Sequence, residues 1–378
     1  MSTGKLLHIV CFDVPYPADY GGAMESFYKI KSLHAIGVKI HLHCFVYGDR
    51  KPQEKLEQYA EKVYYYPRVR NWKYLFSSRP FIVASRMPEA LLANLCAVEA
   101  PVLFDATHTT GFLDHSALQH RKKIVRLHNI EWIYYNTLFR SAVSWQEYLY
   151  FFSEYKKLRK YDATLINADV LSCLSKPDYE YYAEKFPDKK VTLQYVFHEN
   201  TAVSAVPGKG NYILYHGNLS ILDNYKIVMD WLDKYADKIP YPVVVAGKNP
   251  PEVLVRFLQR KNNVRLVANP DSDALATLVR EAQICLAIAA NPSGIKLKLI
   301  NSMYQGRFIF SNPAAFEGSG LEEEVIAMDE NTDVAAAITA YMAVPFTESH
   351  LEKRKAILSA LYDNLQNANA LWDEIEHA

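Results

Sequence analysis

The sequence has few cysteines, no excess of either charge and no long hydrophobic run. Its five cysteines are scattered along 378 residues, which favours buried, reduced thiols over a disulfide framework or a zinc site. Basic and acidic residues both number 42, so the charge excess typical of nucleic-acid-binding proteins is missing. No segment approaches the roughly 18 apolar residues of a membrane-spanning helix, and the first apolar run is too short for a signal peptide. We therefore expect a soluble, cytoplasmic protein that binds no nucleic acid.

Short apolar runs instead alternate with longer helical patterns, an arrangement typical of parallel sheets with helical crossovers. The alternation stops at Thr201–Asn211, which has the composition of a linker, and then restarts. The sequence therefore predicts an α/β fold with two Rossmann-like, doubly wound domains, at residues 1–200 and 211–349. A long final helix is expected at 350–378, packing back on the first domain.

The expected strands of the first domain lie at Leu6–Phe12, Val38–Val46, Val63–Tyr66, Val102–Phe104, Ile124–Leu127 and Val170–Leu174. Its helices are expected at Met24–Ile36, at Ala84–Ala97, through most of Ile130–Ala168 and at Pro177–Lys185. Strands of the second domain are expected at Tyr212–His216, Val243–Ala246, Val264–Val267, Ile284–Ile288 and Phe308–Phe310. Its helices are expected at Tyr225–Tyr235, Glu252–Arg260, Asp273–Glu281 and after Gly294.

The segment Gly294–Gly306 is the most informative part of the chain. Its apolar residues recur at helical spacing, and Gly306 is a typical C-terminal stop. Lys296 and Lys298 fall on the first turn, where backbone N–H groups already attract anions. The pattern predicts a phosphate site, and an ordinary solvated basic turn is the alternative.

Other polar residues follow the expected strands, where open α/β sheets bind ligands. Gly21 and Gly22 follow the first strand and permit close backbone approach, although a plain turn explains them as well. They do not form the GxGxxG fingerprint, which disfavours a nicotinamide cofactor. His128 and Glu131 follow the strand at Ile124–Leu127 and could hydrogen-bond sugar hydroxyls. His128 could also stabilise charge near a reacting centre, unless it and Asn129 only cap the next helix.

The second half carries similar loops. Gly217 and Asn218 follow one strand, and Lys248 follows the next. Glu317, after a later strand, could accept ribose or sugar hydroxyls. Together with Gly294–Lys298, these loops predict a pocket for a nucleotide diphosphate.

These motifs, in this order, resemble the GT-B glycosyltransferases, and specifically the large retaining group called family 4, over essentially the whole chain. The matching pieces are Gly21-Gly22, His128, Gly217-Asn218-Leu219, the Gly294–Gly306 block with Lys296 and Lys298, and Glu317-Gly318. The resemblance implies two Rossmann-like domains facing across a cleft, with a nucleotide-sugar donor on the second and an acceptor on the first. It implies that the glycine loop lies near the donor diphosphate and His128 near the transferred sugar. It also implies no metal ion, because positive side chains and helix N-termini hold the leaving diphosphate.

The chain departs from the family pattern at two places. Two glutamates eight positions apart are replaced by Ser293 and Asn301. The Arg and Lys that grip the diphosphate align with Asn218 and the Asp223–Asn224 region. Lys296, Lys298 and Lys248 would then supply the positive charge, and Asn301 could still hydrogen-bond a ribose hydroxyl.

The resemblance therefore predicts a retaining hexosyltransferase that moves a hexose from a nucleotide-diphosphate sugar to a glycan or lipid-linked acceptor in bacterial surface polysaccharide synthesis. No cofactor or metal is expected. The predicted catalytic residues are His128, Lys296 and Glu131, and the predicted donor contacts are Gly21, Gly22, Gly217, Asn218, Lys248, Gly294, Lys298, Asn301 and Glu317. One alternative is an inactive nucleotide-sugar-binding subunit, favoured by the missing glutamates. Another is a nucleotide-sugar epimerase, which needs clustered carboxylates for which only Glu131 and Glu317 are candidates.

Basic and aromatic residues interleave between Lys55 and Arg86. Such a segment suits peripheral contact with anionic lipid at the inner face of the membrane, where a lipid-linked acceptor would lie. A loop on the acceptor side of a soluble enzyme explains the same pattern.

Overall fold

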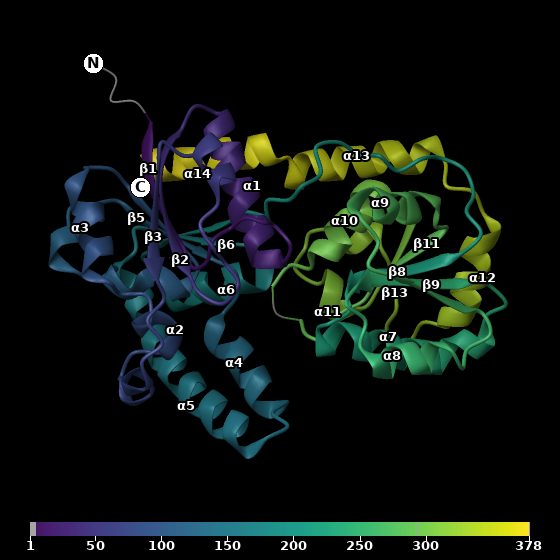
Figure 1. Ribbon diagram of the computed structural model, residues 1–378. Coiled ribbons are helices and arrows are strands. Elements are labelled where there is room, and N and C mark those ends of the chain that lie inside the picture. The colour runs from purple at the N-terminus through teal and green to yellow at the C-terminus, as the bar shows by residue number, and fades with distance from the viewer. Residues whose placement is uncertain (1–4, 293, 378) are drawn as a thin grey trace. The chain divides into compact units, whose positions relative to one another are not determined.

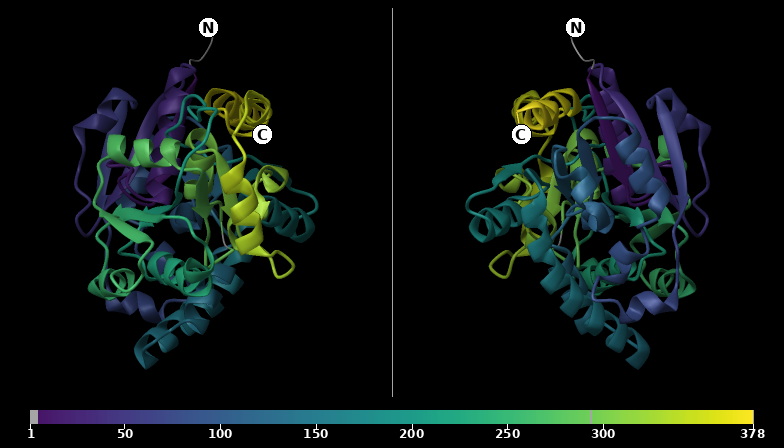
Figure 2. Two further views of the ribbon diagram at one scale, coloured as in Figure 1. Left: turned by 90° about the vertical axis from the view of Figure 1, so that its right-hand side faces the viewer. Right: turned by 90° about the vertical axis from the view of Figure 1, so that its left-hand side faces the viewer.

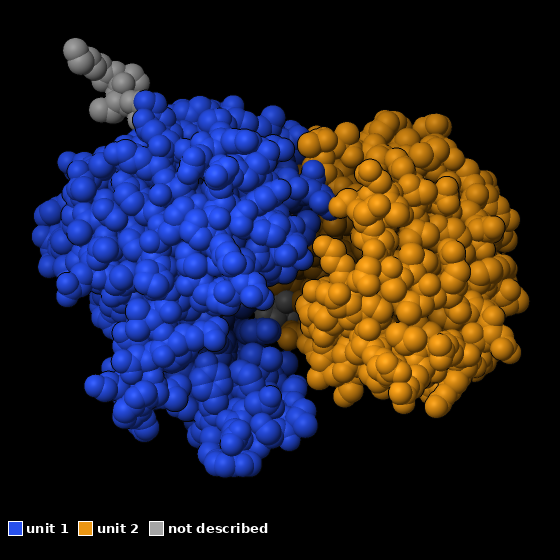
Figure 3. Space-filling view, in the orientation of Figure 1, with its two compact units in different colours: residues 1–199, 363–378 blue, residues 200–362 orange. Residues whose placement is uncertain are grey.

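The computed structural model describes residues 5–292 and 294–377. The chain divides into two compact units, Met1–Glu199 with Asp363–Ala378, and Asn200–Tyr362 (Figure 3). Each unit is a doubly wound parallel α/β layer, as the alternating pattern predicts. The tract expected to be a linker belongs to the second unit, where Gly208 forms a β-bridge with Phe346.

The first unit is built on a seven-stranded parallel sheet in the order β3-β2-β1-β4-β5-β6-β7. All six predicted strands are present, and β7, half-buried and without a continuous apolar run, was not predicted. Most of the strands are buried along nearly their whole length because helices cover both faces of a parallel sheet. The strands are β1 (Leu6–Cys11), β2 (Lys39–Val46), β3 (Lys62–Pro67), β4 (Val102–Asp105), β5 (Lys123–Leu127), β6 (Val170–Cys173) and β7 (Lys190–Leu193).

Most helices of this unit lie on the two faces of its sheet (Figure 1, Figure 2), whereas α2, α4 and α5 pack against one another. One core joins strands β1 and β2 to α1 and α14, and the other joins β4 to β6 with α3 and α6. The helices are α1 (Gly21–Ala35), α2 (Phe81–Ala84), α3 (Glu89–Ala97), α4 (Glu131–Arg140), α5 (Trp145–Tyr161), α6 (Lys176–Lys185) and α14 (Asn364–Glu376).

Two predicted helices are divided in the structure, whereas the stretch predicted to be mostly helical is so. The helix expected at Ala84–Ala97 is divided into α2 and α3, and Pro88 precedes the second. The stretch Ile130–Ala168 forms the antiparallel pair α4 and α5, and α5 begins with a capping box between Ser144 and Glu147.

The second division lies near the C-terminus. The single final helix expected at 350–378 is two helices, because Asp363 accepts a hydrogen bond from the Gln366 N–H and caps a new helix. Helix α13 (Glu348–Tyr362) belongs to the second unit. Helix α14 belongs to the first, where Leu371 and Ile375 enter the core beside α1.

The second unit is built on a six-stranded parallel sheet in the order β10-β9-β8-β11-β12-β13. The five predicted strands are present, and only the two-residue β13 was missed. The strands are β8 (Ile213–Asn218), β9 (Val243–Lys248), β10 (Val264–Ala268), β11 (Ile284–Ala287), β12 (Phe308–Ser311) and β13 (Ile326–Ala327). The helices are α7 (Leu222–Tyr235), α8 (Glu252–Leu258), α9 (Ser272–Glu281), α10 (Leu297–Gln305), α11 (Pro313–Phe316), α12 (Val334–Ala343) and α13.

Candidate active site

Each sheet has a topological switch point at which the strand order reverses. It lies between β1 and β4 in the first unit and between β8 and β11 in the second. Ligands of open α/β sheets bind beyond the carboxyl ends of the strands at such points. The residues that follow these strands therefore form the candidate site of each unit.

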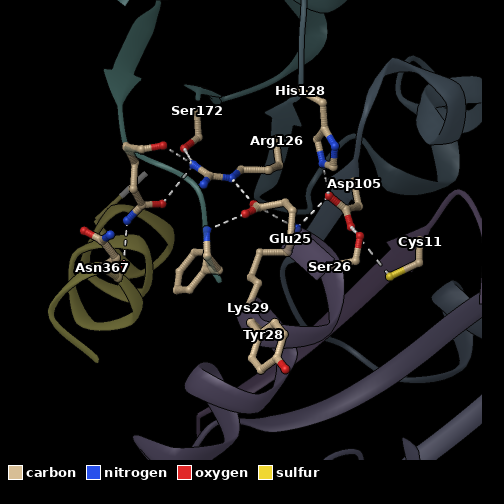
Figure 4. Close-up of polar contacts among 12 residues, drawn as sticks. Cys11, Glu25, Ser26, Tyr28, Lys29, Asp105, Arg126, His128, Ser172 and Asn367 are labelled. Atoms are coloured by element: carbon tan, nitrogen blue, oxygen red, sulfur yellow. Dashed lines mark hydrogen bonds and ion pairs between the residues drawn. The ribbon is translucent and has the colours of Figure 1, made fainter. Parts of the chain in front are cut away.

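In the first unit, Asp105 is the centre of a buried polar network (Figure 4). It ends β4 and accepts hydrogen bonds from Nε2 of His128 at 2.8 Å, Nζ of Lys29 at 2.6 Å and Oγ of Ser26 at 2.5 Å. Burial acts to raise the pKa of Asp105, but Lys29 and His128 outweigh it and hold that pKa well below its usual value. Asp105 is therefore ionised at neutral pH and fixes the orientation of the His128 ring.

The same network continues through a second buried ion pair (Figure 4). Nε of Arg126 donates to Glu25 at 2.9 Å, and its Nη1 reaches Oγ of Ser172 and the Gln194 carbonyl. Burial acts to raise the pKa of Glu25, but Arg126 and Lys29 keep it lowered. Because two carboxylates alternate with two cations, the network fixes α1, β4, β5 and β6 around His128 without a net buried charge.

The Phe12 ring lies between Gly22 and the rings of His108 and His128. Its ring meets the edge of the His128 ring at 5.5 Å and lies 5.4 Å from the His108 ring. A Cβ on Gly22 would lie 2.7 Å from the Phe12 ring, so the missing side chain leaves room for that ring. Gly21 and Gly22 are thus the first residues of α1, and Phe12 packs over Gly22.

Glu131 is the buried first residue of α4. It accepts a hydrogen bond from Nδ2 of Asn129 at 3.1 Å and lies 3.7 Å from Nδ1 of His108. Asn129 does not cap the helix, since the N-cap position is Ile130. Burial raises the pKa of Glu131 to about 8 and lowers that of His108 well below its usual value. At neutral pH a mostly protonated carboxyl group therefore lies beside an uncharged imidazole, whose Nδ1 has no hydrogen-bond partner among the described residues.

His108 also lines a cleft of about 1010 Å³ in the first unit. The cleft is formed by residues that follow β1, β2 and β3 and by residues of α2, α4 and α5. Most of the lining is aromatic or cationic, as in Tyr20, Tyr47, Phe81, Tyr150, Arg68 and Arg86. The cleft can therefore hold a sugar ring or a similar flat group together with an anion.

In the second unit, the glycines and polar residues predicted to bind the donor lie at one edge of the sheet. Asn218 ends β8 beside Lys248, which ends β9 and is exposed. A Cβ on Gly247 would lie 1.9 Å from the Gly217 carbonyl oxygen, so these two strands approach closely only because residue 247 is glycine. Glu317 is exposed, after β12 and α11.

Helix α10 follows β11 and carries the two predicted lysines at its start. Lys296 is the N-cap residue, and Gly294 precedes it with a left-handed φ of 68°. Nζ of Lys298 donates to the Ile288 carbonyl at 2.8 Å, to Oδ1 of Asn224 at 3.0 Å and to the Tyr215 hydroxyl at 3.3 Å. All three hydrogens of the ammonium group are thus donated to partners within the second unit. Lys298 therefore holds its positive charge at a fixed position near the start of α10.

Burial, with a smaller effect of Lys296, lowers the pKa of Lys298 to about 8. Asn301 lies on the same helix, and its Oδ1 accepts a hydrogen bond from Nδ2 of Asn200 at 2.8 Å. Ser293, the position of the other missing glutamate, lies outside the described residues.

Sequence reasoning missed much of the buried network, although two signals were available. Asp105 directly follows the strand predicted at Val102–Phe104, the position where ligand-binding residues are sought. Glu25 and Lys29 lie one helical turn apart on a buried helix face. No property of Phe12 marks it in the sequence as a residue between two histidines. Among residues 5–292 and 294–377, no group of three or more His, Cys, Asp or Glu side chains is placed to hold a metal ion.

No family model matches the sequence. The chain is 24% identical over 352 residues to a Klebsiella pneumoniae protein described as an uncharacterized 44.6 kDa protein in the cps region, covering 85% of this chain and 87% of that one. The structure of this chain is similar to that of sucrose-phosphate synthase from Thermosynechococcus elongatus, with a TM-score of 0.72 at 16% identity over 99% of this chain and 98% of that one. It is also similar to Anabaena HepE in complex with UDP and glucose, with a TM-score of 0.65 at 12% identity over 99% and 100%. The chain has the GT-B fold.

Proposed function

We propose that this GT-B protein is a retaining hexosyltransferase of family 4. It would move a hexose from a nucleotide-diphosphate sugar to a glycan or lipid-linked acceptor, without a metal ion or other cofactor. The observation that carries the proposal is the set of glycines and lysines at the carboxyl edge of the second sheet, around its switch point. The UDP and glucose bound to HepE, and the cps region that holds the Klebsiella protein, support a nucleotide-sugar donor and a role in surface polysaccharide synthesis.

The second unit would bind the donor. Backbone N–H groups at the start of α10 and the charges of Lys296 and Lys298 favour the leaving diphosphate. Lys248 would add a third cation from the end of the neighbouring β9. Gly217, Asn218, Asn301 and Glu317 would contact the sugar or the ribose.

The first unit would bind the acceptor and supply His128. The ionised Asp105 accepts the hydrogen of Nε2, so Nδ1 is the ring nitrogen that remains for the transferred sugar. The protonated Glu131 would act in proton transfer through His108, which lines the cleft.

The experiment is a thermal-shift screen with UDP, GDP, ADP, TDP and CMP and their common sugar conjugates, followed by a nucleotide-release assay with the sugar of the best base. Lys296→Ala should lower the release rate at least tenfold without changing the melting temperature. Lys238→Ala is the control, because Lys238 is exposed in the loop before β9, at the opposite edge of the sheet. Equal rates for both variants would contradict the role of Lys296.

An inactive donor-binding subunit is the second candidate. The Asn301 amide replaces a family glutamate and is already held by Asn200, so it makes a weaker partner for a ribose hydroxyl than a carboxylate would. Donor binding without nucleotide release, across glycan and lipid-linked acceptors, would favour this function over the transferase. Conversion of the donor sugar to its epimer would favour an epimerase.

We further propose peripheral attachment to the cytoplasmic face of a membrane. Large apolar side chains are exposed at two places in the first unit. One is the turn Trp72–Phe76, where Phe76 is 81% exposed, and the other is the start of α5, where Trp145 is 70% exposed. Aromatic side chains in such positions suit the headgroup region of a bilayer. None of the helices within residues 5–292 and 294–377 has the length and hydropathy of a membrane span.

A further inference from the structure

Three arginines of the first-unit cleft form no ion pair within the part of the chain that the structure describes. Arg68, Arg70 and Arg86 all line the cleft. Their guanidinium groups lie 4.8, 5.7 and 5.4 Å from the centre of the Tyr47 ring, respectively. Among the described residues, no carboxylate lies within ion-pair distance of any of the three. The cleft therefore gathers three positive charges around one aromatic ring.

The burial of Arg86 lowers the stability of the fold when no anion is bound in the cleft. Its side chain is 2% exposed, and it donates from Nε to the Phe12 carbonyl at 2.8 Å and from Nη1 to the Ile82 carbonyl at 2.7 Å. Burial and the neighbouring Arg68 lower its pKa to about 10. A buried cation that lacks a counter-ion destabilises a fold unless an anion joins it.

The fourth arginine of the cleft, Arg50, differs from the other three because it has acidic partners. Arg50 pairs with Asp19, and its Nε lies 3.7 Å from Asp13. Two of the three acidic side chains of the cleft, Asp13 and Asp19, are therefore already paired with Arg50. The third, Asp49, is exposed and makes no ion pair within the described part of the chain.

We propose that Arg68, Arg70 and Arg86 form a subsite for a phosphate or diphosphate group carried by the acceptor. The inference rests on the proposed transferase function, and it deepens that function by naming the chemistry of the acceptor. A carboxylate brings a single charge, whereas a phosphate ester or diphosphate brings about two or more and matches the fork of each guanidinium. The aromatic walls of the cleft would pack against the group that follows the anion.

The test is isothermal titration with inorganic pyrophosphate, farnesyl diphosphate and farnesol, in the absence of nucleotide. Arg68→Gln/Arg70→Gln should weaken binding of both diphosphates by about tenfold per arginine. Arg86 is left intact, because its two carbonyl contacts join the ends of β1 and α2. Arg121→Gln is the control, since Arg121 precedes β5, at the opposite edge of the same sheet. Melting temperatures of the variants show that they are folded.

Tighter binding of farnesyl diphosphate than of pyrophosphate would support the subsite and indicate a lipid-borne phosphate. Equal binding of the two would support the subsite and indicate recognition of the phosphate alone. Unchanged binding in the double variant would overturn the proposal, because the anion would then bind elsewhere, such as at the lysines of the second unit. Equal binding of farnesol and farnesyl diphosphate would overturn it as well. The nucleotide screen uses other ligands and residues, so failure of the donor function would be seen independently.

Discussion

Nε2 of His128 lies 2.8 Å from Oδ1 of Asp105, which ends β4, and His128 directly follows the neighbouring parallel strand β5. The carboxylate also accepts from Lys29, so one side chain both neutralises a buried lysine and orients the histidine. The role proposed for His128 and the stability of the first unit therefore depend on the same atoms. Changes at Asp105 must be measured as changes in folding before they are interpreted as changes in activity.

Asp105→Asn should lower the free energy of unfolding by about 3–5 kcal/mol at pH 7, because it leaves the buried Lys29 with only Glu25, which lies 3.7 Å away and is already paired with Arg126. The folded-state pKa of Asp105 is lowered from 3.8. Its contribution to stability is therefore present above about pH 4 and is lost as the pH falls further. Urea denaturation from pH 3 to 7 measures both effects, and the acid sensitivity of the wild type should be smaller in the variant.

Asp188→Asn is the control for this prediction, since Asp188 is exposed and its substitution should change stability by less than about 0.5 kcal/mol. If Asp105→Asn changed stability as little as the control, Asp105 would not be the counter-ion that the hydrogen bonds indicate.

Glu131→Gln should remove a part of the pH dependence of stability between about pH 4.5 and 8. The pKa of Glu131 rises from 4.5 to about 8 on burial, so its contribution to stability is complete below about pH 4.5. It is lost as the pH rises through 8, by up to roughly 1.4 kcal/mol per pH unit in that window. Relative to the wild type, the variant should therefore gain stability as the pH rises from 5 to 9.

Glu180→Gln provides the comparison for Glu131, because the Glu180 side chain is 61% exposed and its substitution should leave the pH profile unchanged. Chemical denaturation at several pH values gives the difference in unfolding free energy. A difference for Glu131→Gln that is independent of pH would show that the carboxyl group ionises normally in the folded protein.

The fold could be predicted from the sequence because parallel strands buried on both faces leave runs rich in apolar residues, as in Leu6–Cys11. Strand β7 could not, since its residues are only half-buried and carry no such run. Helix breaks were missed where a single side chain decides them, as at Ser144 and Asp363. His128 and Lys296 were predicted as site residues because they follow predicted strands, and their roles stay predictions.

The unpaired arginines could not be assigned from the sequence. Arg68 and Arg86 lie in a segment rich in basic and aromatic residues, which predicts membrane contact and an acceptor-side loop equally well. Only the packing of α2 and the ends of β2 and β3 shows that these arginines line a cleft and that Trp72 and Phe76 are exposed. The same segment therefore carries arginines that suit an acceptor-side loop and exposed aromatic residues that suit membrane contact, at different positions.

Trp72→Ser/Phe76→Ser should weaken binding to vesicles of phosphatidylglycerol at least tenfold, since each aromatic ring would otherwise leave water on contact with the bilayer. Trp145→Ser/Leu149→Ser, at the start of α5, should have a similar effect. Vesicle flotation measures both. Val253→Ser is the matched control, because Val253 is 52% exposed in the second unit. Binding of the wild type should also fall as salt is raised, because basic residues such as Lys73 contribute by charge. If both double variants floated as well as the control, contact with lipid through these two places would be wrong, and the exposed aromatic side chains would require another partner.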